Sequence, residues 1–169
     1  MNSKNLLTQR MSEEYARRKG ISGDVIGVFA EEFYFLSNFY NSKINFKTGQ
    51  RFLNGEAAFQ AMKDPSRAEE FYNLQPNEAK RLGRRVKLRN DWESYKDEAM
   101  RKVVLRKFRG NDKLKRLLLN TGDSYLVEGN TWNDKCWGVC AGEGENRLGI
   151  ILMDVREKIK KDNSKLLSK

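Results

Sequence analysis

The stretch NDWESYKDEAMRKVVLRKFRG, residues 90–110, predicts the long helix that marks this chain as rich in helix. Asn90 and Glu93 form a pair that resembles a capping box at its start. Gly110 follows the last apolar residue, in the place where glycine commonly ends a helix. Between these limits, residues that can pack in a core recur at helical spacing and form one stripe: Trp92, Tyr95, Ala99 and Val103.

Further helices are expected on both sides of this stretch. Asn54 is a favourable N-cap for a helix that Pro65 ends, because the residue before proline avoids the helical region. Pro76 suits the first position of a helix over residues 76–85. Another helix is expected over residues 112–120. A last helix is expected from near Glu145, with a core face of Leu148, Ile151, Leu152, Val155 and Ile159.

The remaining ordered segments read as strands. These are residues 25–30, the aromatic-rich residues 33–40, a hairpin over residues 43–52 with Thr48 and Gly49 at its turn, and residues 124–128. The fold class is therefore α+β, mainly α-helical with a small sheet. We expect one domain over residues 25–160, after an N-terminal extension (1–24) with a short helix at 13–19. A basic C-terminal tail (161–169) is expected to fray.

Length and hydropathy narrow the class of protein. A chain of 169 residues suits one domain with a sizeable core. No apolar run approaches the length that spans a membrane, and the N-terminal segment lacks the apolar core of a secretory signal. We therefore expect a cytoplasmic protein with no membrane partner.

The chain has no histidine, which excludes Ser-His-Asp and Cys-His machinery and removes the commonest metal ligand. Acid–base chemistry must then fall to carboxylates, lysines or tyrosines. The two cysteines, Cys136 and Cys140, are too few for a disulfide framework and lack the spacing of a zinc or redox site. We expect them to be small buried side chains.

The net charge of +10 is concentrated in one stretch. Residues 80–116 hold 15 basic and 5 acidic side chains, so the rest of the chain sums to zero. Such a concentration of positive charge favours a phosphate-bearing partner, either a nucleotide or a nucleic acid. The alternative is a solvated helix face without a partner.

Glu56, Gln60 and Lys63 share one face of the expected helix after Asn54, at positions i, i+4 and i+7. The other residues of this helix are mostly apolar, so three aligned polar residues need an explanation. A carboxylate can act as a base or stabilise positive charge, and a lysine in a partly apolar pocket can form a Schiff base. Alternatively, Glu56 and Lys63 only stabilise the two helix ends and Gln60 is exposed.

The segment WNDKCWGVCAGEGENR, residues 132–147, predicts a glycine-rich loop. Its tryptophans could stack on a base, and its backbone could approach a phosphate near the start of the last helix. The alternative is that the tryptophans belong to the core and the glycines only serve turns. The glycine spacing matches neither a dinucleotide fingerprint nor a phosphate-binding loop.

Four segments occur in an order that resembles the NADAR (YbiA-like) N-glycosidase family. They are FLSNFY (35–40), NGEAAFQAMKD (54–64), LGRRVKLRNDWESYKDEAMRKVVLRKF (82–108) and LVEGNTWNDKCWGVCAGEGENRLGIILMDVRE (126–157). The resemblance implies a helical α+β domain that cleaves an N-glycosidic bond at ribose C1. The implied substrates are ADP-ribosylated guanine, in a nucleotide or a nucleic acid, and phosphorylated ribosylaminopyrimidines of riboflavin synthesis.

The resemblance also implies roles for individual residues. Glu56, Lys63 and Asp134 fall on catalytic positions, with Lys63 forming a Schiff base with the ring-opened sugar. No metal and no cofactor are required. The implied substrate-binding positions are Asn38, Phe39, Gln60, Arg84, Trp92, Trp137, Gly138, Asn146 and Arg147.

In this mechanism Arg84 helps to hold a phosphate, and Trp92 or Trp137 stacks on a base. The chain departs from the family pattern at Ala57 and Ala58, where a histidine and a tyrosine are expected, which favours a roomier or less polar pocket. Two other functions fit part of the pattern: a non-catalytic module that binds ADP-ribose or NAD, and a nucleic-acid-binding module that uses residues 80–116.

Overall fold

The computed structural model describes residues 1–167, and they form two compact units. Unit 1 consists of Met1–Ser37 and Lys115–Lys169, and unit 2 consists of Asn38–Leu114. The expected hairpin and the Glu56 helix lie in unit 2, whereas the glycine-rich loop and the last helix lie in unit 1.

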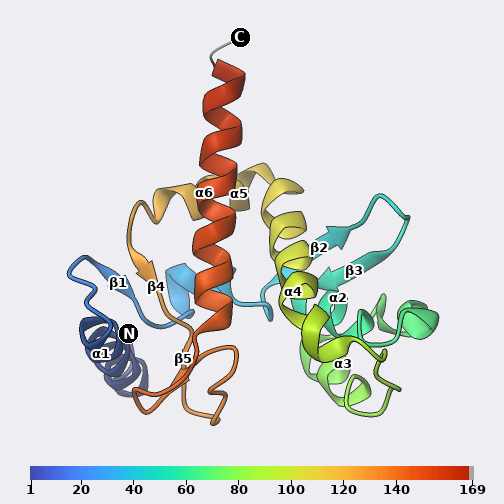
Figure 1. The fold of residues 1–169 in the computed structure, drawn as a ribbon, viewed down its shortest axis with the longest axis horizontal. Helices are drawn as coiled ribbons and strands as arrows, with labels where there is room; N and C mark the ends of the chain where they lie inside the picture. The colour runs from blue at the N-terminus through green and yellow to red at the C-terminus, as the bar shows by residue number, and fades with distance from the viewer. Residues whose placement is uncertain (168–169) are drawn as a thin grey trace. The chain divides into compact units, whose positions relative to one another are not determined.

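Helices dominate both units (Figure 1). The α-helices are α1 Ser3–Arg18, α2 Gly55–Ala61, α3 Pro76–Leu82, α4 Trp92–Arg109, α5 Asp112–Asn120 and α6 Arg147–Leu167, with 3-10 helices η1 Glu31–Leu36 and η2 Pro65–Phe71. The strands are β1 Val25–Ile26, β2 Asn41–Asn45, β3 Arg51–Asn54, β4 Tyr125–Leu126, β5 Gly129–Asn130 and β6 Val139–Cys140. The predicted class, α+β and mainly helical, is confirmed.

Unit 1 is built on two short parallel ladders. β1 pairs with β4 and β5 pairs with β6. The helix α1 packs on β1 and β5, where Ser12 Oγ donates to Gly27 O at 2.8 Å, and α6 packs on β4. Tyr15, Val127 and Val139 form a buried cluster between these elements. The predicted core face of α6 is confirmed, since all five of its apolar residues are buried.

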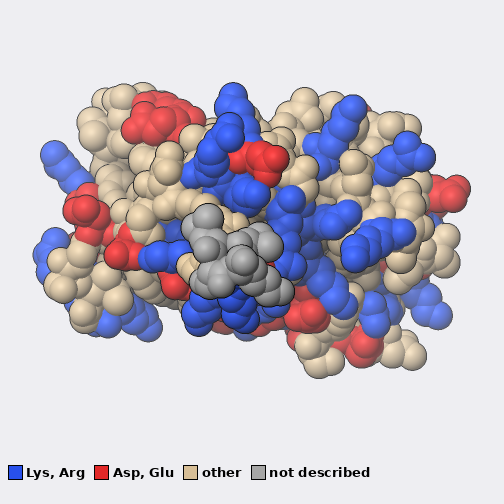
Figure 2. Space-filling model, turned by 90° about the horizontal axis from the view of Figure 1, so that it is seen from above, with Lys and Arg blue, Asp and Glu red and all other residues tan. Residues whose placement is uncertain are grey.

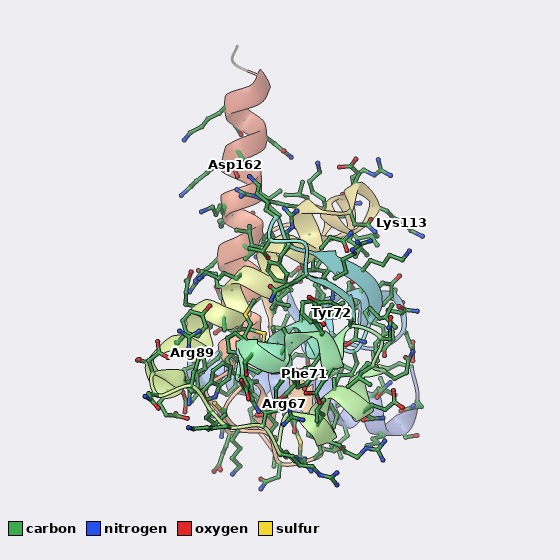
Figure 3. The ribbon with its side chains drawn as sticks, turned by 90° about the vertical axis from the view of Figure 1, so that its right-hand side faces the viewer. Arg67, Phe71, Tyr72, Arg89, Lys113 and Asp162 are labelled. Carbon is green, nitrogen blue, oxygen red and sulfur yellow. The ribbon has the colours of Figure 1, made fainter. Side chains whose placement is uncertain are left out.

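Unit 2 surrounds α2 with other elements. The antiparallel hairpin β2–β3 turns at Thr48 and Gly49, as predicted, and its register places Ile44 opposite Phe52. α2 contacts β3, η2, α3 and α4. Figure 3 shows Phe71 and Tyr72 of the η2 segment beside this helix, where the Tyr72 ring meets Phe52 edge-on at 5.1 Å between centroids. The consequence is a seven-residue helix buried on all sides.

Three of the expected strands differ in the structure. The expected strand over residues 33–40 is wrong, because residues 31–36 form the 3-10 helix η1. Residues 25–30 and 124–128 form only the two-residue ladder of β1 and β4. In place of one small sheet, the described residues hold three sheets of two strands each.

Helix ends also differ from the expected ones. α1 begins at Ser3 rather than near Glu13, with Asn2 Oδ1 accepting from Asn5 N at 2.8 Å. The expected capping box ahead of α4 is wrong: Asp91 is the N-cap, and no side-chain cap bond forms there. The box forms instead at α3, where Gln75 N donates to Glu78 Oε2 at 2.8 Å.

At the C-terminal end, α6 continues as helix to Leu167, so the expected fraying is wrong over residues 161–167; residues 168–169 lie outside the described part. Across residues 1–167, no helix combines the length and the apolar character needed to cross a bilayer.

Candidate active site

The helix α2 is fixed at its start by two asparagines. Asn54 Oδ1 accepts from Ala57 N at 2.8 Å, and Asn54 Nδ2 donates to Leu74 O at 3.0 Å. The main chain of Asn38 adds a third hydrogen bond, in which its carbonyl oxygen accepts from Glu56 N at 3.0 Å. The predicted N-cap is therefore confirmed, and these bonds fix the direction of the Glu56 side chain.

Glu56 and Gln60 are buried side by side one turn apart. Their exposed fractions are 8% and 6%, and Gln60 Nε2 donates to Glu56 Oε1 at 2.8 Å. Gln60 Oε1 is buried without a hydrogen-bond partner. A buried polar atom without a partner costs roughly 1–3 kcal/mol, which a purely structural helix would have no reason to retain. The expected alternative of an exposed Gln60 is wrong.

Lys63 lies two residues beyond the last residue of α2, where the turn continues through a bond from Lys63 N to Gln60 O at 3.2 Å. Its side chain is half-buried. Nζ donates to Gly83 O at 3.2 Å and lies 5.9 Å from the centroid of the Trp92 ring. The amine therefore sits between the α2–η2 turn, the end of α3 and the start of α4.

Burial lowers the pKa of Lys63 below the ordinary value for lysine. The positive charges of Arg84 and Lys80 lower it further, while the charge of Glu56 opposes the shift. Because burial disfavours the charged form, more of this amine is neutral near pH 7 than in an exposed lysine. A neutral amine is the form that attacks a carbonyl or imine carbon.

The side chains around Lys63 are aromatic and basic. Trp92 is 6% exposed and packs on Phe59, with ring centroids 5.3 Å apart. Its ring is thus a wall beside Lys63 and not an open stacking surface. Lys80 Nζ lies 5.8 Å from the centroid of the Phe39 ring, and Arg84 is exposed.

Asn38 is buried at the start of unit 2. Its Nδ2 atom lies 3.0 Å from the Met100 sulfur, and its Oδ1 atom has no hydrogen-bond partner. Gly55 lies against this amide so closely that an added Cβ would approach Asn38 Oδ1 to 2.8 Å. Asn38 and Gln60 each form a hydrogen bond with Glu56, and each has a buried side-chain oxygen without a hydrogen-bond partner.

In unit 1, Asp134 organises the loop between β5 and β6. Its Oδ1 atom accepts from Cys136 N at 3.1 Å and from Trp137 N at 2.9 Å. Asn130 holds the same loop, since its Nδ2 donates to Asp134 O at 2.7 Å and its Oδ1 accepts from Asp134 N at 3.1 Å. This carboxylate therefore fixes the position of the Trp137 backbone.

Asn146, Arg147 and Gly138 also lie in this part of unit 1. Asn146 is 0% exposed, and its amide joins Glu128 N, at 3.0 Å, to Leu126 O, at 2.9 Å. A direct contact between this amide and a substrate would have to break those bonds. Arg147 Nε donates to Glu145 Oε2 at 2.6 Å, and a Cβ on Gly138 would clash with Glu128 O at 2.3 Å.

The predicted site residues thus fall into two sets. Unit 2 holds Asn38, Phe39, Glu56, Gln60, Lys63, Arg84 and Trp92, and unit 1 holds Asp134, Trp137, Gly138, Asn146 and Arg147. The first set is gathered around α2 through the contacts above. The second set is gathered around the β5–β6 loop and the start of α6. Cys136 and Cys140 of that loop are half-buried rather than buried as expected, and neither forms a disulfide.

Two residues beside Lys63 were not among the predicted ones. Gly83 supplies the carbonyl that Lys63 Nζ binds, and a Cβ there would come within 1.9 Å of Gln60 Oε1. Lys80 acts on the charge of Lys63. The excess of basic residues after position 80 hinted at Lys80, whereas only tertiary packing reveals the position of Gly83.

A protein-family model described as the NADAR domain matches residues 27–160. The chain belongs to the NADAR family. The matched segment runs through both units, so they are parts of one NADAR domain, as the sequence predicted.

Relatives of this NADAR chain agree over most of its length. The N-glycosidase YbiA of Escherichia coli is 40% identical over 139 residues, which is 75% of this chain and 86% of the relative. The NMR structure of E. coli YbiA superimposes with a TM-score of 0.73 at 38% identity, covering 85% of this chain and 89% of that one. A riboflavin biosynthesis protein of Vibrio vulnificus is 38% identical over 131 residues, or 74% of this chain and 35% of that protein.

Proposed function

We propose that this chain is an N-glycosidase that cleaves the bond between ribose C1 and a nitrogen in a phosphorylated ribosyl or ADP-ribosyl compound. The observation that carries the proposal is the buried pair of Glu56 and Gln60 beside the amine of Lys63, whose pKa burial lowers. The two YbiA matches support it, because that relative is named an N-glycosidase.

Lys63 is proposed as the nucleophile. In the ring-opened sugar, C1 is double-bonded to the protonated leaving nitrogen, and neutral Nζ adds to C1. One proton then passes from Nζ to the leaving nitrogen, the C1–N bond to the amine or base breaks, and an imine joins C1 to Lys63. Water adds to this imine, the C1–Nζ bond breaks, and the free sugar leaves with its aldehyde restored.

Glu56 is proposed as the proton relay in these steps. Its carboxylate is held by Gln60 Nε2 and lies near enough to Lys63 to act on the charge of that amine. A fixed carboxylate at this place can take the proton from Nζ and deliver it to the leaving nitrogen. It also stabilises positive charge at C1 while the bond breaks.

The remaining predicted residues are proposed to bind the substrate. Arg84 and Lys80 stand near Lys63 and would hold phosphate, since a guanidinium can bind it through two hydrogen bonds. Trp92 shields Lys63 from water and is too buried to stack on a base, so we assign the stacking role to Trp137. Asp134 is proposed to position Trp137 through its bond to the Trp137 amide.

The proposal is tested by turnover of two substrates, followed by mass spectrometry. Wild-type protein and the Glu56→Ala variant would each receive DNA carrying ADP-ribosyl guanine and a free ribosylaminopyrimidine phosphate. We expect the wild type to cleave at least one of them and the variant to lose that activity. If the folded wild type binds these compounds but cleaves neither, the chain is a binding module and the proposal is wrong.

A further inference from the structure

Between β6 and α6 the chain turns back on itself in a tight turn, here called the β6–α6 hairpin (residues 140–143). Cys140 N donates to Glu143 O at 2.9 Å, and Glu143 N donates to Cys140 O at 3.1 Å. The two residues of the turn, Ala141 and Gly142, both have positive φ, at 51° and 76°. A residue with a Cβ is strained in this left-handed region, so Ala141 keeps its conformation only where neighbouring contacts hold it.

Arg18, the last residue of α1, supplies one of these contacts. Its guanidinium donates to Gly142 O, and a Cβ on Gly142 would come within 2.8 Å of the Arg18 Nη2 atom. The hydrogen bond from Lys135 lowers the pKa of the Glu143 carboxyl, and the charge of Arg18 lowers it further. Figure 1 shows α1 beside the loop that leads into α6. Lys and Arg side chains are common across the face drawn in Figure 2, so this contact, and not the charge alone, distinguishes Arg18.

The helix α1 is a firm base for this contact, because its inward side chains bind the main chain of unit 1. Gln9 Nε2 donates to Val25 O, and Gln9 Oε1 accepts from Gly27 N, both at 2.8 Å. On β5, Gly129 lies so close to α1 that an added Cβ would come within 2.5 Å of Ser12 Oγ. The match to the family model begins at residue 27, after the end of α1. The β6–α6 hairpin is therefore held by a helix that lies outside the matched segment.

The β6–α6 hairpin is joined in turn to the loop between β5 and β6, which carries predicted site residues of unit 1. Lys135 Nζ lies 2.6 Å from Glu143 Oε2, and Glu145 N donates to Lys135 O at 2.8 Å. One turn later, Leu148 N donates to Trp137 O at 3.0 Å. The two segments are thus linked by main-chain bonds and by an ion pair. A hairpin that shifts would therefore disturb the backbone of the β5–β6 loop.

We infer that Arg18 is a positioning residue for substrate binding. From α1 it fixes the β6–α6 hairpin, and through the hairpin it holds the backbone of Asp134 and Trp137 in the conformation that receives the substrate. This inference rests on the proposed function, in which Trp137 stacks on a base. Arg18 acts through the hairpin and not on the reacting atoms.

Loss of this contact should weaken binding more than chemistry. Without it, the backbone that carries Trp137 is less well fixed, and the free energy of ordering that backbone is then subtracted from the binding of substrate. Lys63 and Glu56, which are proposed to carry the chemistry, belong to unit 2, whereas Arg18 and the hairpin belong to unit 1. A rise in KM with little change in kcat is therefore the mark of positioning, because partial unfolding would instead lower the amount of active protein and with it kcat.

The test compares Arg18→Ala with Arg17→Ala, which removes the same charge from the adjacent exposed residue. The readouts are KM and kcat, with whichever of the two proposed substrates the wild type cleaves, and amide hydrogen exchange over residues 134–147. For Arg18→Ala we expect KM to rise about tenfold, as for the loss of one hydrogen bond from a charged group, with kcat within about threefold. Exchange of these amides should become about tenfold faster. Arg18→Lys, which keeps the charge and a donor, should recover part of both effects, and Arg17→Ala should show neither.

Equal effects of Arg17→Ala and Arg18→Ala would overturn the inference. So would a lower melting temperature of Arg18→Ala with KM and loop exchange unchanged, since Arg18 would then serve stability alone. If the wild type cleaves neither substrate, the proposed function fails, and loop exchange then decides the inference separately: faster exchange in Arg18→Ala alone supports it, and unchanged exchange overturns it.

Discussion

Unit 2 contains two lysines whose pKa is lowered by burial, the half-buried Lys63 and the fully buried Lys107, and they differ in the groups around them. Lys63, after α2, is half-buried, donates to a main-chain carbonyl and lies near a carboxylate and two other cations. Lys107, in α4, is 1% exposed, and its Nζ lies 5.6 Å and 5.2 Å from the ring centroids of Tyr40 and Phe108. Burial lowers the pKa of both, that of Lys107 to about 7.

The difference shows that a lowered pKa does not by itself identify a reacting amine. A nucleophile must also be reachable by a substrate and lie near a group that can move protons. Lys63 meets both conditions. Lys107 is enclosed between α4 and the segment around Tyr40, and we expect its effect to be on stability. The predictions below test this division, beginning with the largest effect.

Replacing Lys63 by alanine should abolish most of the activity. Without the amine no imine forms, and we expect kcat to fall by about a thousandfold or more, given the usual contribution of a covalent route. The measurement is turnover of whichever substrate the wild type cleaves. Lys107→Met is the matched control, with kcat expected to stay within a few fold. Equal losses in the two variants would remove the distinction between the two lysines.

Replacing Glu56 by glutamine should also lower kcat strongly. Glutamine keeps the size of the side chain and can still pair with Gln60, but it cannot relay a proton. The expected loss is about 100-fold or more, with a smaller change in KM. Circular dichroism and the melting temperature serve as controls for folding. An unchanged kcat would show that Glu56 serves only the start of α2.

The dependence of kcat on pH should reveal the titration of Lys63. Because burial and nearby cations lower the pKa of this amine, its neutral form increases at a lower pH than in an ordinary lysine. We expect kcat to rise up to about tenfold per pH unit below that pKa and to level off below the ordinary lysine value of about 10.4. A rise with its midpoint at the ordinary value would place the nucleophile in an exposed position.

Replacing Gly83 by alanine should disturb the site without touching a reacting group. The new Cβ would come within 1.9 Å of Gln60 Oε1, so Gln60 must move away from Glu56. Overpacking of this kind costs about 1–3 kcal/mol of stability, and we expect kcat to fall by about tenfold. Gly23→Ala is the comparison variant, since nothing lies within 4 Å of an added Cβ there and its φ is not positive. Full activity in Gly83→Ala would show that the Gln60–Glu56 bond is dispensable.

Lys107 should make stability depend on pH. Its pKa is about 7 in the folded chain and about 10.4 when unfolded, so between these values the unfolded state binds more protons. The free energy of unfolding should therefore rise with pH across this window, by on the order of 1–2 kcal/mol between pH 7 and pH 9. Lys107→Met should lose this rise, as measured by denaturation at the two pH values. The same rise in the variant would assign it to other groups.

The sequence predicted the elements whose signals are local. Asn54 and Pro65 bracket α2, the turn at Gly49 defines the hairpin, and the apolar period fixes α6. The sequence predicts only the second half of α1, because the buried side of this helix is mostly small or polar: Thr8, Ser12, Tyr15 and Ala16. Such a face gives little hydrophobic period. The aromatic-rich segment of η1 resembles a strand in sequence, because a short apolar run does not distinguish a strand from a short helix.

The candidate site was predictable to the extent that it lies on one helix. The spacing of Glu56 and Gln60 correctly places them one turn apart on α2. Lys63, expected on the same helix, instead lies in the turn that follows it. The carbonyl of Gly83 and the wall formed by Trp92 and Phe59 depend on how α3 and α4 pack, which spacing does not encode. Asn146 differs from its predicted role. It is expected to bind the substrate, but its buried side-chain amide forms hydrogen bonds with the main chain of Glu128 and Leu126.

The central claim is that Lys63 forms an imine with ribose C1, and reductive trapping tests it most directly. Wild type, Lys63→Ala and Lys107→Met would each be incubated with substrate and sodium borohydride, then digested and analysed by mass spectrometry. The account predicts a sugar adduct on the peptide that carries Lys63 in wild type and in Lys107→Met, and none in Lys63→Ala. Product formation in the wild type without any adduct on Lys63, or with the adduct on another lysine, would contradict it.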